Sequence, residues 1–227
     1  EFHYFFLFFI PLILTASLED LYQNISIGLR FLSMIVSVFL IVYYSDAILD
    51  EVNIEFINTI LSIKFFAITF TVLGIIVTCN SWNFIDGVNG VASGLGAFTL
   101  FVFSTLIGEN ILYGLKEFLV LISCITLAFT IINLFSGKIF LGDTGAYFLG
   151  CLIGWSGVLI ASKDPKVSSW AVFLIIIYPA TEITVSVFRR MFRKTSPFIA
   201  DNLHLHSLLY QYILKETKIN SKLVNSL

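Results

Sequence analysis

Polar residues recur at every third position between Asn80 and Asn89, directly after an apolar run. The segment reads Asn-Ser-Trp-Asn-Phe-Ile-Asp-Gly-Val-Asn-Gly, so Asn80, Asn83, Asp86 and Asn89 would lie on neighbouring turns of a helix. Unpaired polar groups at the edge of a membrane are costly, and a helix cap needs one such residue rather than four. A carboxylate flanked by amides suits a hard cation such as Mg²⁺. We interpret the segment as a cation site, with helix-capping and turn residues as the alternative.

Two further polar segments carry carboxylates that could act beside a cation or a phosphate. Glu19 and Asp20 are adjacent carboxylates, and such a repelling pair at a membrane edge indicates a nearby cation. A solvated acidic loop or a helix cap would give the same pattern. Asp143 lies in the glycine-flanked turn Phe-Leu-Gly-Asp-Thr-Gly. There it either caps the following helix or lies beside a phosphate or a metal.

Basic residues and histidines gather in the C-terminal part of the chain. Arg189 and Arg190 end the last apolar run, so they are either ordinary cytoplasmic-side charges or a clamp on a diphosphate. His204 and His206 follow Asp201 in a polar segment. Because no cysteine or third histidine accompanies them, zinc is poorly supported, and hydrogen bonding to phosphate suits the two imidazoles better.

The composition requires most of these residues to be positioned by membrane helices. The chain has 227 residues, of which 58% are hydrophobic and 12% charged, and its mean hydropathy is +0.94. Too few charges are present to cover the surface of a soluble domain. We predict an all-α, polytopic integral membrane bundle of about seven transmembrane helices. Runs long enough to span lie at 2–17, 28–45, 58–79, 89–108, 116–135, 145–162 and 168–188.

These spans alternate the connecting segments between two sides of the membrane. All the chemical candidates fall on one side, which holds 18–27, 80–88, 136–144 and 189–207. That side carries more positive charge near the span ends, namely Arg30, Lys138, Arg189, Arg190, Arg193 and Lys194 against Lys64, Lys116, Lys163 and Lys166 opposite. We therefore predict a multi-pass protein of the inner (plasma) membrane, and the positive-inside rule predicts that the side with the chemical candidates faces the cytoplasm.

Taken in this order, the motifs resemble the polyprenyl-phosphate N-acetylhexosamine-1-phosphate transferase family, from about Leu18 to about Tyr210. Glu19 and Asp20 fall at the Asp-Asp pair of that family. Asp86 falls at the Mg²⁺-binding aspartate of its Asn-x-x-Asn-x-x-Asp-Gly signature. The resemblance implies one catalytic domain over 1–227, truncated at the N-terminus and also at the C-terminus, since the family's outer spans are not seen.

The resemblance also implies roles for individual residues. The predicted catalytic residues are Glu19, Asp20, Asp86 and Asp143, with Asp86 and Asp20 as metal ligands. The predicted substrate-binding residues are Asn80, Asn83, Asn89, Lys138, Arg189, Arg190, Asp201, His204 and His206. Three positions depart from the family pattern: Glu19 replaces an aspartate, Asn89 stands where many members have aspartate, and Ser207 stands where a third histidine is frequent.

The activity so implied is transfer of N-acetylhexosamine-1-phosphate from a UDP-sugar to polyprenyl (undecaprenyl) phosphate, with release of UMP. It would initiate cell-surface polysaccharide or cell-wall lipid-intermediate synthesis. The cofactor would be Mg²⁺, or Mn²⁺ in its place. The partners would be the two substrates and the membrane, without nucleic acid, and a homodimer is left open. The competing classes are a transporter, whose polar groups should lie at mid-membrane, and a non-catalytic scaffold, which has no need to cluster them.

Overall fold

The computed structural model describes residues 2–108, 112, 114–137, 139–193, 208, 209 and 212. Within them the chain forms helices and no strand. The elements are η1 (Phe2–Phe9), α1 (Ile10–Tyr22), α2 (Ile27–Ser45), α3 (Glu55–Leu61), α4 (Lys64–Ile85), α5 (Val91–Leu106), α6 (Leu115–Ser136), α7 (Gly142–Lys163), α8 (Ser169–Ile175) and α9 (Ile177–Phe192). The predicted all-α class is confirmed.

Five stretches of the described chain are long and apolar enough to cross a membrane. They are η1 with α1, α2, α4, α6 and α7, and the bent pair α8–α9 is a sixth if it counts as one span. Helix α5 has 16 residues and is shorter than a usual span. The apolar segments therefore form a polytopic membrane bundle, with α5 in the place of the fourth of the seven predicted spans.

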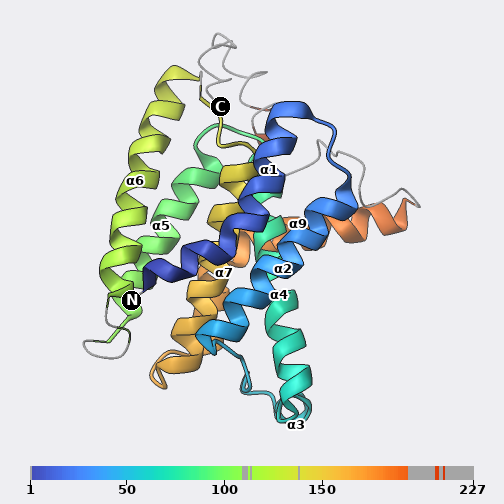
Figure 1. The fold of residues 1–227 in the computed structure, drawn as a ribbon, viewed down its shortest axis with the longest axis vertical. Helices are drawn as coiled ribbons and strands as arrows, with labels where there is room; N and C mark the ends of the chain where they lie inside the picture. Colours follow the sequence, from blue (N-terminus) through green and yellow to red (C-terminus); the bar gives the residue numbers. More distant parts are fainter. Residues whose placement is uncertain are drawn as a thin grey trace.

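Helix α7 is the centre of the bundle and packs most closely on α4 (Figure 1). An unbroken run from Leu149 to Ile160 is buried. A Cβ atom at Gly150 would lie 2.8 Å from the Cα atom of Cys79, so only glycine allows the two helix backbones this close. Helices α5 and α6 lie side by side at one edge, and α1 and α2 cover another face of α7.

Two predicted helix boundaries are wrong. The span expected at 58–79 is instead a short helix, α3, followed after a break by α4, which runs from Lys64 to Ile85. The polar residues Asn80 and Asn83 therefore lie on the helix itself. The span expected at 168–188 is broken at Ile176, where α8 and α9 meet at 74°. Hydropathy averaged over a window of about twenty residues detects neither a bend nor a short amphipathic turn.

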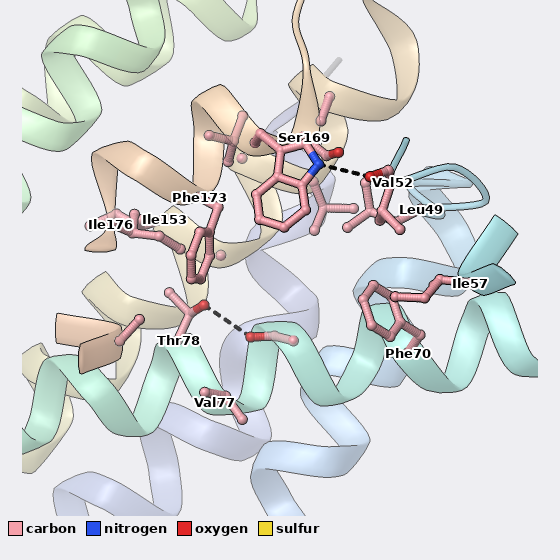
Figure 2. Close-up of a pocket in the computed structure, with 18 of the residues that line it drawn as sticks. Leu49, Val52, Ile57, Phe70, Val77, Thr78, Ile153, Ser169, Phe173 and Ile176 are labelled. Atoms are coloured by element: carbon pink, nitrogen blue, oxygen red, sulfur yellow. Dashed lines mark hydrogen bonds between the residues drawn. The ribbon is translucent and has the colours of Figure 1, made fainter. Parts of the chain in front are cut away.

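An apolar pocket of about 360 Å³ lies beside this bend, between α4, α7, α8 and the segment before α3 (Figure 2). Thr78 of α4 lies opposite Phe173 of α8, and Phe70, further along α4, lies beside Ile57. The indole N–H of Trp170 donates a hydrogen bond of 2.8 Å to the carbonyl of Val52, which ties α8 to the segment before α3. The pocket is thus part of the packed helix bundle and lies between the membrane-spanning helices.

Candidate functional site

The C-terminal ends of α1 and α4 meet the N-terminal end of α7 on one side of the bundle, toward the top of Figure 1. They surround a polar pocket of about 730 Å³. Its lining includes Asp20 from α1, Asn83 from α4, Asp86 directly after α4, and Asp143 from α7. The structure therefore brings together residues from three of the predicted site segments, as expected for segments on one side of a membrane.

Asp20 caps helix α7. Its Oδ1 atom accepts a hydrogen bond of 2.9 Å from the backbone N–H of Asp143. Its Oδ2 atom accepts from the backbone N–H of Thr144 at 3.0 Å and from the Thr144 hydroxyl at 2.6 Å. The first N–H groups of a helix have no partner within the helix, and a negative charge there also interacts well with the helix dipole. Asp20 therefore holds the start of α7 in place from another helix.

The close approach of Asp20 depends on Gly142. This residue has a φ of +69°, which side chains other than glycine rarely adopt. A Cβ atom on it would lie 2.9 Å from Oδ2 of Asp20. The glycine in the turn Phe-Leu-Gly-Asp thus serves both the backbone conformation and the contact with the carboxylate.

Asp143 does not cap its own helix, so that alternative is wrong. Its Oδ1 atom accepts a hydrogen bond of 2.9 Å from the side-chain amide of Asn83. Its Oδ2 atom accepts one of 2.8 Å from Nη1 of Arg30 on α2. Both oxygens of Asp143 are therefore oriented by partners on other helices, and its carboxylate faces the pocket.

Asp86 differs from the other two aspartates because its side chain makes no hydrogen bond or ion pair with any residue that the structure describes. It lies just after the end of α4. Burial raises the pKa of Asp86 to about 7, and the nearby carboxylates of Asp143 and Asp20 contribute in the same direction. A bound cation would offset this cost of ionising Asp86.

The carboxylates of this pocket would supply only part of the coordination shell of a magnesium ion. Among the described residues, no group of three His, Cys, Asp or Glu side chains could hold a metal by itself. Mg²⁺ needs only one or two protein carboxylates, because water and phosphate oxygens complete its shell. Asp86 is free to be one such ligand, and Asp20 is the predicted second. The donor set is therefore incomplete without phosphate oxygens or water.

Glu19 and Asn80 lie outside the lining of this pocket. Glu19 accepts a hydrogen bond of 2.8 Å from the backbone N–H of Ile25 and lies 3.7 Å from Arg30, so it braces the turn between α1 and α2. Asn80 donates to the carbonyl of Ile76 at 2.8 Å and to the sulfur of Met34 at 3.3 Å. The described contacts of both residues are with other protein groups, and their predicted roles stay predictions.

The remaining predicted residues divide into three groups. Asn89 lines the pocket. Arg189 and Arg190 lie in the last turn of α9, and the guanidinium of Arg190 lies 5.4 Å from the ring centre of Phe84, next to Asn83 on α4. The residues outside the described part of the chain are Lys138, Asp201, His204 and His206.

Two residues of the site were not predicted from the sequence. Arg30 had been counted only as a charge at a span end, yet it binds Asp143. Asn133, near the end of α6, lines the pocket, is buried, and donates its amide to the carbonyl of Ile139. An amide inside an otherwise apolar run was the available signal for Asn133. The partner of Arg30 lies 113 residues away, so no local pattern could reveal it.

The chain is similar in sequence to known transferases. The sequence model of glycosyl transferase family 4 matches residues 2–161. An undecaprenyl-phosphate alpha-N-acetylglucosaminyl 1-phosphate transferase of Thermotoga maritima is 31% identical over 93% of this chain and 62% of its own length. A phospho-N-acetylmuramoyl-pentapeptide-transferase of Chlamydia pneumoniae is 31% identical over 78% of this chain and 52% of its own. The chain thus spans between half and two thirds of the length of these relatives.

Proposed function

Because the chain belongs to glycosyl transferase family 4, we propose that the complete protein transfers N-acetylhexosamine-1-phosphate from a UDP-sugar to a polyprenyl phosphate and releases UMP. By their names, one of the relatives above is an N-acetylglucosaminyl 1-phosphate transferase acting on undecaprenyl phosphate, and the other is a transferase of phospho-N-acetylmuramoyl-pentapeptide. The observation that carries the proposal is the pocket in which Asp86, which has no side-chain partner among the described residues, lies beside Asp20 and Asp143 at the ends of membrane-spanning helices.

This pocket suits a reaction between two phosphates. Asp86, with Asp20 as the predicted second ligand, would hold Mg²⁺, which when bound offsets the repulsion between the anionic substrates. In the transfer, an oxygen of the lipid phosphate forms a bond to the sugar-linked phosphorus. The bond from that phosphorus to the oxygen of UMP breaks, and UMP leaves with both electrons. When the attacking lipid phosphate and the departing UMP are both dianions, the exchange needs no net proton transfer. The site then serves chiefly to position the reacting phosphates.

The protein's own contacts assign that positioning to particular residues. Asp20 and Gly142 fix the start of α7, which presents Asp143 to the pocket. Asn83 and Arg30 then fix the orientation of the Asp143 carboxylate. Asn89 and Asn133 supply amide groups at the pocket wall. The carboxylates are therefore preorganised before a substrate binds.

The polyprenyl tail needs apolar surface within the membrane. We propose that the apolar pocket beside the α8–α9 bend takes part of it, since this pocket lies at the depth of the spans and is lined almost wholly by apolar side chains (Figure 2). The polar pocket lies instead at the helix ends. This separation suits a lipid phosphate with its head at the membrane surface and its tail inside, whereas a transporter would place its polar site at mid-span.

The same arrangement supports placing the polar pocket at the cytoplasmic face of the inner membrane. Arg30 pairs with Asp143 at this end of the bundle, and the guanidinium of Arg190 lies over Phe84 near the end of α4, so basic residues gather on the side that the positive-inside rule assigns to the cytoplasm. UDP-sugars would then reach the pocket from the cytoplasm. Cysteine labelling at Asn89 and at Asp50, in intact and in permeabilised cells, measures this topology, and labelling of Asn89→Cys from outside intact cells would contradict it.

The activity is tested with the complete protein in detergent, supplied with UDP-GlcNAc, undecaprenyl phosphate and Mg²⁺. We expect release of UMP together with transfer of the labelled sugar to lipid. Asp86→Asn keeps the size of the side chain but removes the charge, so kcat should fall at least about 100-fold. Asp50→Asn, an exposed carboxylate near the opposite end of the bundle, is the matched control. Undiminished activity of Asp86→Asn would exclude its metal role, and absence of sugar transfer by the wild type would refute the function.

A further inference from the structure

The geometry points to Arg30 as a positioning residue that acts on the reaction through Asp143. The inference rests on the proposed function. From the sequence, Arg30 is only a positive charge at the end of a span, whereas the structure gives it a part in the reaction. Arg30 lies in the first turn of α2, and Asp143 lies in the first turn of α7.

Arg30 joins two of the acidic residues at this end of the bundle. Its Nη1 atom lies 2.8 Å from Oδ2 of Asp143 and 3.7 Å from Oε1 of Glu19. The side chains of Arg30 and Asp143 are 22% and 27% exposed, so water screens the pair only in part. The shorter contact is a charge-assisted hydrogen bond to an oxygen of Asp143, which leaves the other oxygen to accept from Asn83.

The location of Arg30 is otherwise unfavourable for a cation. The first turn of a helix carries the positive end of its dipole. In addition, the Nε atom of Arg30 is buried and has no hydrogen-bond partner within the part of the chain that the structure describes, which costs desolvation energy. The ion pairs with Asp143 and Glu19 are the described contacts that offset these costs. An arginine that contributed only positive charge on the cytoplasmic side would be more stable with its guanidinium in water.

The consequence of losing Arg30 follows from the two hydrogen bonds that hold Asp143, one from Arg30 and one from Asn83. Without Nη1, the carboxylate keeps only the amide of Asn83 and can rotate about its side-chain bonds. It would then carry an uncompensated charge toward Asp20 and Asp86, both of which line the same pocket. A displacement of about 1 Å in a preorganised site lowers turnover by about 100-fold. Substrate affinity should change little, because Arg30 does not line the pocket.

The first test separates positioning from substrate binding. In the complete protein, Arg30→Met should lower kcat for UMP release by about 100-fold and leave KM for the UDP-sugar within about threefold. Arg30→Lys, which keeps the charge and one donor, should recover part of kcat. The control Lys163→Met removes a cation paired with Asp46 at 3.2 Å at the other end of α7 and should stay near wild type. A raised KM with unchanged kcat would mean that Arg30 binds substrate, which overturns the inference.

The second test asks whether Arg30 acts through Asp143. We expect the double variant Arg30→Met, Asp143→Asn to be no less active than Asp143→Asn alone. The thermal unfolding midpoints of the wild type, the two single variants and the double variant should show that the two substitutions are coupled. Additive effects in both measurements would overturn the inference. If Arg30→Met does not fold, Arg30→Lys takes its place in the cycle under the same criteria. A wild type that releases no UMP refutes the proposed function, while the thermal cycle still decides whether the two side chains are paired.

Discussion

Replacing Asp20 with alanine gives the sharpest test of the site, because two roles for this carboxylate predict opposite changes in stability. If Asp20 serves only to bind a cation or a phosphate, it is a like charge beside Asp86 and Asp143, and removing it should stabilise the protein without ligand. If Asp20 also caps α7, as its three hydrogen bonds show, removing it should destabilise the protein.

The magnitudes favour destabilisation. Loss of a side-chain cap costs about 0.5–2 kcal/mol, and loss of a negative charge at a helix N-terminus costs about 0.3–1 kcal/mol more. Against this stands relief of repulsion with Asp86. The rise in the pKa of Asp86 from 3.8 to about 7 corresponds to about 4 kcal/mol. Asp20 is the smallest of its three causes, after burial and Asp143, so the relief is at most a third of this, about 1.5 kcal/mol. We expect a net loss of about 1 kcal/mol.

The pH dependence has a definite sign. Because the pKa of Asp86 is raised in the folded state, its ionisation lowers stability as the pH rises toward and through about 7. Asp20→Ala removes part of that penalty. The variant should therefore lose more stability relative to wild type at pH 6, where Asp86 is mostly protonated, than at pH 8.

The assay is thermal unfolding of the complete protein in detergent with a chelator present, so that no metal contributes. A loss of about 1 kcal/mol corresponds to a midpoint lowered by about 2–4 °C. Asp20→Asn, which keeps one acceptor oxygen, should lie between the alanine variant and wild type. Asp50→Ala, an exposed carboxylate at the other end of the bundle, should change little. A midpoint of Asp20→Ala that is unchanged or raised at pH 6 would refute the capping role.

Two further predictions concern glycines. Gly142→Ala should lower stability by about 1–3 kcal/mol in thermal unfolding, because its φ is +69° and a Cβ atom would lie 2.9 Å from Asp20. Gly28→Ala, where a Cβ atom meets nothing within 4 Å, should not, and equal effects would contradict the geometry. Gly74 lines the apolar pocket and is equally open, so Gly74→Leu should fill the pocket and raise KM for undecaprenyl phosphate by about tenfold. KM for a short-chain prenyl phosphate should rise less, and the tail site is wrong if Gly28→Leu has the same effect.

The sequence alone determined the class of the protein and pointed to several of the residues that line its polar pocket. Apolar runs of about twenty residues can satisfy their backbone groups in a bilayer only as helices, so composition and hydropathy were sufficient for the all-α membrane bundle. The spacing of Asn83 and Asp86, and the turn that contains Asp143, marked residues that the structure places around one pocket. Alternation of the connecting segments was enough to predict that these motifs lie on one side.

Only the tertiary structure decided what each of these residues does. Asp20 and Asp143 are both carboxylates in polar turns, yet one caps a helix 124 residues away and the other is gripped by Arg30 and Asn83. Asn80 shares the motif of Asn83 but faces Met34. A carboxylate's role depends on which donors reach it, and those donors come from helices far apart in the sequence. The bend after α8 escaped prediction for a related reason, since hydropathy measures the length of an apolar segment and not its direction.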